Sequence, residues 1–207
     1  MLTAAALALL VIAATQPAAA QQPTAAPSTS YQAFPSPQQE PGPSSGETTT
    51  AIGLLEFDPY LTQVQVTFYL KNLNPSQIAA FHLHCGLPGQ LGPIVVNFNI
   101  FGSFTQTFSQ VDSNTYLFSQ TVTDADVDEA NWPPSSLRPP PACAANNIGP
   151  APATNIAGIE ALARIGQLYF NVHVGNSIRQ PTYFFGLIRG QVYSVETPIN
   201  AALPAVM

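Results

Sequence analysis

The chain has 207 residues, and its five Lys and Arg stand against eleven Asp and Glu, for a formal net charge of −6. Only 8% of the residues are charged. This balance argues against binding to nucleic acid or to anionic membrane surfaces, because both need clustered cations. The length predicts one domain with appended segments.

The chain begins with a run that is apolar from Leu2 to about Ala14 and ends in small residues before Gln21. This pattern is typical of a secretory signal peptide, so we expect residues 1–20 to be removed and the protein to be secreted. The run is shorter than the roughly 20 apolar residues of a membrane span. No Lys or Arg precedes it, which leaves a retained anchor as the alternative. We expect no membrane span after cleavage.

Residues 21–49 are rich in Pro, Ser, Gln and Ala and have almost no large aliphatic side chains. A segment of this kind buries too little apolar surface to offset its ordering entropy, so we expect a disordered linker. Its recurring Ser-Pro and Ala-Pro pairs could carry O-linked sugar. The folded domain is expected over residues 50–196, with a C-terminal tail at residues 197–207.

Period-two alternation of apolar and polar residues predicts strands from about residue 50 onward. It is clearest at residues 63–70 and 94–100, where the inward sets are Val64, Val66, Phe68 and Leu70, and Ile94, Val96, Phe98 and Ile100. Weaker strand patterns lie at residues 51–57, 103–108, 115–122 and 183–195. Gly186 and Gly190 in the last of these indicate a bulge or a close backbone approach.

One segment has helical periodicity. Its apolar stripe consists of Ile156, Ile159, Leu162 and Ala163. Thr154 or Asn155 can cap its start, and Gly166 can end it. Seven or eight short strands and one short helix predict an all-β, antiparallel sandwich or barrel.

The chain has two cysteines, Cys85 and Cys143. An oxidising compartment favours a disulfide between them, which would close a loop of nearly sixty residues and contribute roughly 4 kcal/mol. The bond would also hold a long Pro-rich loop, residues 125–152, beside the strand that contains Cys85. Two separate buried thiols are the alternative.

All three histidines of the chain lie in strand-like segments, His82 and His84 in A-F-H-L-H-C-G and His173 in L-Y-F-N-V-H-V. Side chains alternate across a strand, so His82 and His84 share one face while Cys85 lies on the opposite, core-facing side. By the same rule His173 shares its face with Tyr169 and Asn171. If the two strands are neighbours, three imidazoles meet on one surface.

Three imidazoles form a ligand set that suits copper or zinc and leaves a fourth position for water or substrate. Tyr169 and Asn171 are candidates for the outer shell that orients the rings. The alternative is a wet polar face on which the histidines bond only to water or to Tyr169. A blue-copper site is not expected, because such a site has an axial Met and the only methionines are Met1 and Met207.

Three segments resemble the signatures of CHRD domains, modules named from chordin. They are H-L-H-C-G-L-P-G-Q-L-G-P-I-V-V at residues 82–96, G-Q-L-Y-F-N-V-H-V at residues 166–174 and G-L-I-R-G-Q at residues 186–191. The resemblance spans roughly residues 48–196. It implies an antiparallel Greek-key sandwich similar in plan to copper/zinc superoxide dismutase, which also has a His-x-His strand and a later histidine.

The segments depart from the family in two places. Leu187 stands where the family usually has Glu, which removes a carboxylate beside Arg189, and residues 130–153 form an expanded Pro-rich insertion. Dismutase activity is not expected, since no histidine remains for a fourth copper ligand or a zinc loop. The resemblance does not carry over the antagonism of growth-factor signalling known for chordin.

The sequence thus predicts a secreted domain that binds a metal, most plausibly copper, through His82, His84 and His173, with zinc as the other candidate. A role in metal sequestration, delivery or redox sensing would follow. The alternative is a structural or adhesive module that binds cell-wall or extracellular-matrix components without metal. A copper-dependent oxidoreductase is a third hypothesis.

Overall fold

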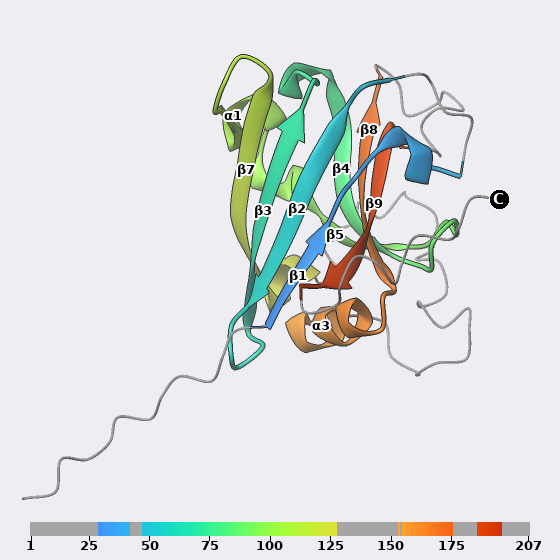
Figure 1. The fold of residues 1–207 in the computed structure, drawn as a ribbon. Helices are drawn as coiled ribbons and strands as arrows, with labels where there is room; N and C mark the ends of the chain where they lie inside the picture. The colour runs from blue at the N-terminus through green and yellow to red at the C-terminus, as the bar shows by residue number, and fades with distance from the viewer. Residues whose placement is uncertain (1–28, 42–46, 128–152, 154, 176–185, 196–207) are drawn as a thin grey trace, which may run out of the picture.

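The protein is described by a computed structural model that places residues 29–41, 47–127, 153, 155–175 and 186–195. Within these residues nine strands form one antiparallel sheet in the order β5-β4-β8-β9-β1-β2-β3-β7-β6 (Figure 1). The strands are β1 (Thr29–Ala33), β2 (Thr50–Phe57), β3 (Gln63–Lys71), β4 (Ile78–Cys85), β5 (Ile94–Asn97), β6 (Phe108–Gln110), β7 (Thr115–Thr123), β8 (Leu168–Val174) and β9 (Ile188–Ser194).

The sheet curls so that its two halves face each other across one core. Phe81 of β4 and Phe68 of β3 are far apart in the strand order, yet their ring centroids are 4.5 Å apart. Phe81 also contacts Phe118 of β7, with centroids 5.3 Å apart. The predicted all-β, antiparallel fold is therefore confirmed, and its two layers are halves of a single curled sheet that join where β9 pairs with β1.

The strongest strand patterns form as predicted. In β3 the alternating residues Val64, Val66, Phe68 and Leu70 are all at most 1% exposed. β2 and β7 flank β3 in register and cover the segments predicted at residues 51–57 and 115–122.

Two strand predictions are wrong in part, because local turns replace extended backbone. β5 ends at Asn97, whose side chain accepts a hydrogen bond from the Asn99 amide and starts the 3-10 helix η3 (Phe98–Phe101). Such side-chain bonds to backbone compete with strand pairing. Ile100, predicted to face inward, is 37% exposed. Residues 104–107 of the segment predicted at 103–108 form the helical turn α1 (Phe104–Thr107), and β6 begins only at residue 108.

The largest correction concerns the segment predicted to be a disordered linker. β1 lies between β9 and β2 in the sheet, and its Tyr31 and Ala33 are 2% and 0% exposed. The 3-10 helix η1 (Pro37–Gln39) follows it. The five residues of β1 have little aliphatic content and therefore give no local strand signal. Their side chains are buried because β1 pairs with strands that are distant in sequence. The folded domain therefore begins before residue 50.

The helix forms as predicted. α3 (Ile156–Arg164) begins at Asn155, whose side chain accepts a hydrogen bond from the Gly158 amide. The helix is held to β1 by Glu160, which is 3% exposed and accepts a 2.7 Å hydrogen bond from the Tyr31 hydroxyl. Arg164 pairs with the same carboxylate. The helix α2 (Asp124–Val127) is a single turn.

Several predicted features lie outside the described residues: the signal peptide at 1–20, most of the Pro-rich loop with Cys143, and the tail at 197–207. Cys85 is 1% exposed on the core side of β4, as the alternation predicts. Its bond to Cys143 stays a prediction. No helix among the described residues is long and apolar enough to cross a membrane.

Candidate metal centre

β4 and β8 are neighbouring antiparallel strands, and their pairing brings the three histidines to one surface. His82 lies opposite Asn171, His84 opposite Tyr169, and Ala80 opposite His173. His173 is thus diagonal to His82. One ring nitrogen from each histidine lies within 4.8 Å of the corresponding nitrogens of the other two. The expectation that neighbouring strands gather the imidazoles on one surface holds.

The three rings form a compact, largely buried group. The His82 ring centroid is 5.3 Å from that of His84 and 5.4 Å from that of His173. His82 and His173 are each 5% exposed, and His84 is half-buried. Two nitrogens that each lie about 2.0–2.1 Å from one ion can be up to about 4.2 Å apart. The three rings would therefore need only a small side-chain movement to bind one ion.

The proton on the His84 ring is fixed by the backbone. Its Nδ1 lies 2.8 Å from the Gly92 carbonyl oxygen. Because a carbonyl only accepts, Nδ1 carries the hydrogen and Nε2 presents its lone pair. Among the described residues, His84 Nε2 and His82 Nδ1 are buried ring nitrogens that make no hydrogen bond.

Gly92 also positions the ring of Tyr169. Its amide donates a 3.0 Å hydrogen bond to the Tyr169 hydroxyl, and that ring stacks on His84 with centroids 4.9 Å apart and an 8° interplanar angle. A side chain cannot replace the glycine hydrogen, since a Cβ there would lie 1.6 Å from the Cys85 carbonyl oxygen. One glycine therefore holds two neighbouring rings through its own backbone.

The environment keeps His82 and His84 neutral. Burial lowers the pKa of His84 to about 3, with His173 and Arg189 adding to the effect and the Gly92 carbonyl opposing it. Burial also lowers the pKa of His82 well below its usual value, assisted by the charges that His84 and His173 would carry. Neutral imidazole is the form that binds metal.

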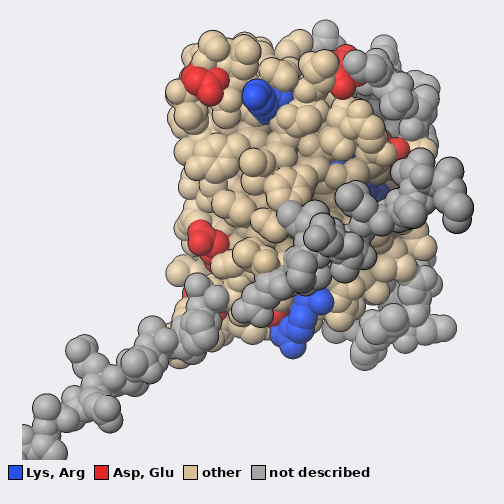
Figure 2. All heavy atoms as spheres, viewed as in Figure 1, with Lys and Arg blue, Asp and Glu red and all other residues tan. Residues whose placement is uncertain are grey.

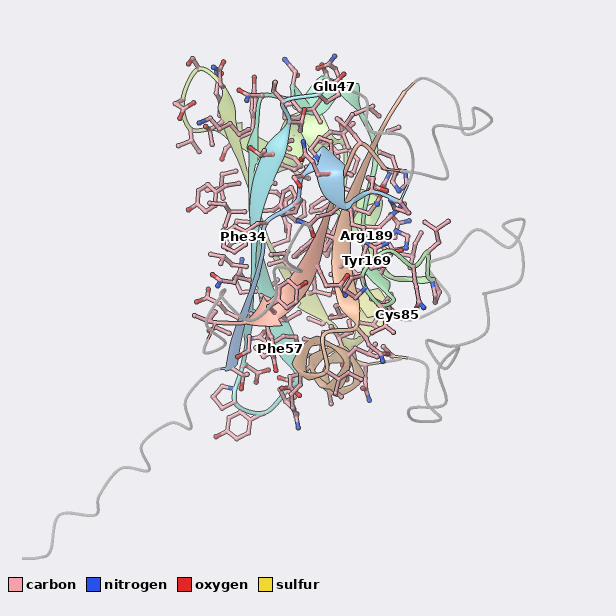
Figure 3. The ribbon with its side chains drawn as sticks, turned by 45° about the vertical axis from the view of Figure 1, so that its right-hand side comes forward. Phe34, Glu47, Phe57, Cys85, Tyr169 and Arg189 are labelled. Carbon is pink, nitrogen blue, oxygen red and sulfur yellow. The ribbon has the colours of Figure 1, made fainter. Side chains whose placement is uncertain are left out.

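Arg189 of β9 fixes the loop that follows His84. It is 1% exposed, and its Nη1 and Nη2 donate to the carbonyl oxygens of Gln90 and Leu87 at 2.6 and 2.8 Å. Its guanidinium carbon lies 3.4 Å from the centre of the Tyr169 ring. Because β8 lies between β4 and β9, Tyr169 is held between His84 and Arg189. Figure 3 shows Tyr169, Arg189 and Cys85 on the same side of the molecule.

Gln191 completes the support of this loop. Its side-chain amide donates to the carbonyl oxygens of Gly86 and Gly166, at 2.8 and 2.7 Å. It thereby ties the residue after β4 to the turn that leads into β8. Arg189 and Gln191 together define the position of Gly92, which in turn defines the His84 ring.

Asn171 links the histidine group to a buried carboxylate. Its amide donates a 2.5 Å hydrogen bond to Glu40, which follows η1. Burial raises the pKa of Glu40, and the nearby Arg189 charge partly offsets this. Gly186 makes room for the pair, because a Cβ there would lie 2.3 Å from Asn171 Oδ1. Glu40 thus supplies a carboxylate to the Arg189 region, although Leu187 replaces the Glu that the family usually has.

The structure places every residue that the sequence singled out as ligand or outer shell on this one surface. The sequence did not single out Glu40, and it included Gly92, Arg189 and Gln191 only as parts of the signatures. A buried Arg inside an apolar strand segment was an available signal for Arg189. Glu40 had none, since it lies in the segment expected to be disordered.

Comparison with protein families agrees with the signatures. The CHRD domain model matches residues 26–192. The chain belongs to the CHRD domain family. The match includes β1, so the family domain begins earlier than the resemblance at residues 48–196 indicated. No curated protein matches the chain, and no solved structure matches it.

The fold explains why three separated signatures mark this CHRD domain. The first supplies His82, His84 and Gly92, and the second supplies Tyr169, Asn171 and His173. The third supplies Arg189 and Gln191, which bind the loop of the first. The signatures are therefore parts of one hydrogen-bonded unit around the imidazoles.

Proposed function

We propose that this CHRD domain is a secreted metal-binding module whose ligands are His82, His84 and His173. The observation that carries the proposal is the pair of buried ring nitrogens, His82 Nδ1 and His84 Nε2, that make no hydrogen bond within the described residues. A buried acceptor without a partner costs roughly 1–3 kcal/mol. A cation held between the rings would remove that cost.

Copper is the metal that this ligand set favours, with zinc as the alternative. Imidazole binds both, and copper has the higher affinity for a given nitrogen site. Among the residues that the structure describes, no carboxylate or thiolate joins the three histidines in the cluster, so hard cations such as calcium or magnesium are poor fits. Three protein ligands would leave a coordination position open to water or a small molecule.

The surroundings are those expected of a pre-organised ligand. The hydrogen of His84 Nδ1 is bound to the Gly92 carbonyl, which is the kind of outer-shell bond that orients metal-bound histidines. Tyr169 limits rotation of the same ring by stacking on it. Burial lowers the pKa values of His82 and His84, so these two rings need not release a proton before binding at neutral pH.

Secretion is supported by two observations. CHRD domains are typically extracellular, and the chain belongs to that family. The apolar run and small residues at positions 2–20 have the order of a cleavable signal peptide. Both observations support an extracellular location for the proposed metal site.

Calorimetric titration of the secreted protein with Cu(II) and Zn(II) tests the proposal. We expect one ion per chain, with loss of at least tenfold in affinity in each of His82→Ala, His84→Ala and His173→Ala. Glu56→Ala is the control, because it removes an exposed carboxylate on β2. Unchanged binding in the histidine variants, or equal loss in Glu56→Ala, would refute the proposal.

Chelation provides an independent readout. An ion bound only by the native state stabilises it by mass action, by about 2.7 kcal/mol at a free concentration of 100 times Kd. The melting temperature should therefore rise with added metal and fall with chelator. Equal melting temperatures under both conditions would favour a module without metal.

A further inference from the structure

The outer face of the β1–β2–β3–β7 layer carries a row of apolar side chains that contacts no other element of the sheet. Phe34, which follows β1, extends a row formed by Ile52, Tyr69 and Leu117, each opposite the next in strand register. Phe34, Ile52 and Tyr69 are 41%, 45% and 37% exposed. We call these four residues the apolar row.

The apolar row and one register row beside it carry no charged residue. The adjacent register row contains Leu54 opposite Thr67, both half-buried. On the other side of the apolar row, the next register row contains Lys71, and Glu56 lies two rows away on the side of Leu54. Figure 2 shows this face directly, with Lys, Arg, Asp and Glu at its margins and uncharged surface between them.

We propose that this face binds an uncharged polysaccharide, with the sugar rings packed on the apolar row. Aromatic rings give large contact area at an interface while their polar tips stay hydrated. An exposed apolar patch rimmed by polar groups marks an interaction surface. The row itself and the adjoining row of Leu54, Thr67 and Ser119 carry no charge, and the net charge of −6 disfavours acidic polymers.

Hydroxyl and amide groups in the next two register rows of the same face suit a sugar chain. Gln65 donates to the Ser119 hydroxyl at 3.0 Å and accepts from the Thr121 hydroxyl at 2.8 Å. These bonds link the three side chains, and the Gln65 amide also donates to the Val66 carbonyl oxygen at 3.5 Å, while the hydroxyls keep acceptor capacity. A sugar hydroxyl can use those groups without leaving any of them buried and unpaired.

The dimensions and polarity also favour a glycan over a second copy of the chain. The row crosses four strand positions, about 14 Å at the usual strand spacing of 4.7–4.9 Å. A stable homodimer needs about 800 Å² of mostly apolar surface on each partner. Here three well-exposed apolar side chains lie among Gln, Ser and Thr.

The apolar row is separate from the histidine group. Figure 3 shows Phe34 on the opposite side of the molecule from Tyr169 and Arg189. The row belongs to the layer of β2, β3 and β7, whereas the histidines belong to β4 and β8. Glycan binding is therefore expected to be independent of metal.

Sedimentation with insoluble cellulose, chitin and β-1,3-glucan, in buffer of moderate salt, tests the proposal on the full secreted chain. We expect retention on at least one of these neutral polymers, and at least about tenfold weaker binding in Tyr69→Ala and in Phe34→Ala. Tyr60→Ala is the matched control, because Tyr60 is an aromatic residue 85% exposed in the turn between β2 and β3. Melting temperatures of all three variants should equal that of the wild type.

Three results would overturn the proposal. One is the absence of retention on every neutral polymer. Another is an equal loss of retention in Tyr60→Ala, which would indicate nonspecific adhesion. The third is a dimer in analytical ultracentrifugation that Tyr69→Ala dissociates, since the face would then bind a second copy. His84→Ala should leave retention unchanged, which separates this test from that of the metal site.

Discussion

Acidification of the metal-free protein should destabilise it through the histidine group, and the size of the effect follows from His84. The folded state does not protonate this ring until its pKa of about 3, whereas the unfolded chain takes up the proton near pH 6.5. The stability that the neutral ring contributes is therefore complete above about pH 6.5 and is lost as the pH falls toward 3.

A pH of 5 is about 1.5 units below the ordinary pKa of histidine, so the ring is largely protonated in the unfolded chain. At about 1.36 kcal/mol per unit, His84 alone should lower the free energy of unfolding by about 2 kcal/mol relative to pH 7.5. His82 acts in the same direction, because burial lowers its pKa as well. For a domain of this size the melting temperature should fall by roughly 4–8 °C through His84.

Urea unfolding in chelator, followed by circular dichroism at pH 7.5 and at pH 5, measures this difference. His84→Gln is the comparison, because glutamine does not titrate and its amide can still donate to the Gly92 carbonyl. The variant should lose about 2 kcal/mol less than the wild type between the two pH values. Parallel losses in the two proteins would show that His84 is not held neutral by burial.

Three further predictions concern groups other than the three histidines. Gly92→Ala should destabilise the domain by at least about 2 kcal/mol in urea unfolding, because its Cβ would meet the Cys85 carbonyl; wild-type stability in this variant would contradict the loop geometry. Burial and Glu160 raise the pKa of Tyr31 to about 12, so stability should fall as the pH rises from about 10 to 12, and Tyr31→Phe should abolish that fall. Alkylation of the unfolded protein should modify neither Cys85 nor Cys143 without reductant and both with it, and modification of both without reductant would refute the disulfide.

The sequence predicts the histidine cluster because strand alternation is a local rule. His82 and His84 must share a face in any strand, and His173 must share one with Tyr169. Only the neighbouring positions of β4 and β8 had to be assumed, and the structure supplies them. The resemblance to CHRD signatures was correct because the same residues carry the site.

The support of the site was not predictable, because it depends on contacts between distant segments. Arg189 reaches carbonyl groups about 100 positions earlier in the chain, and no periodicity records that distance. Glu40 and β1 were missed because a short Pro- and Gln-rich segment has no strand signal of its own. Ile100 was assigned to the core by extending the strand alternation to residue 100. The assignment was wrong because a capped turn at Asn97 breaks that alternation.

The most direct test of the account is the number of imidazole nitrogens bound to the metal in the copper-loaded protein. Pulsed electron paramagnetic resonance and X-ray absorption spectroscopy count these ligands and measure their distances. We expect three imidazole nitrogens at about 2.0–2.1 Å, reduced to two in His84→Ala. A spectrum with one or no bound imidazole, or one that His84→Ala leaves unchanged, would contradict the central claim.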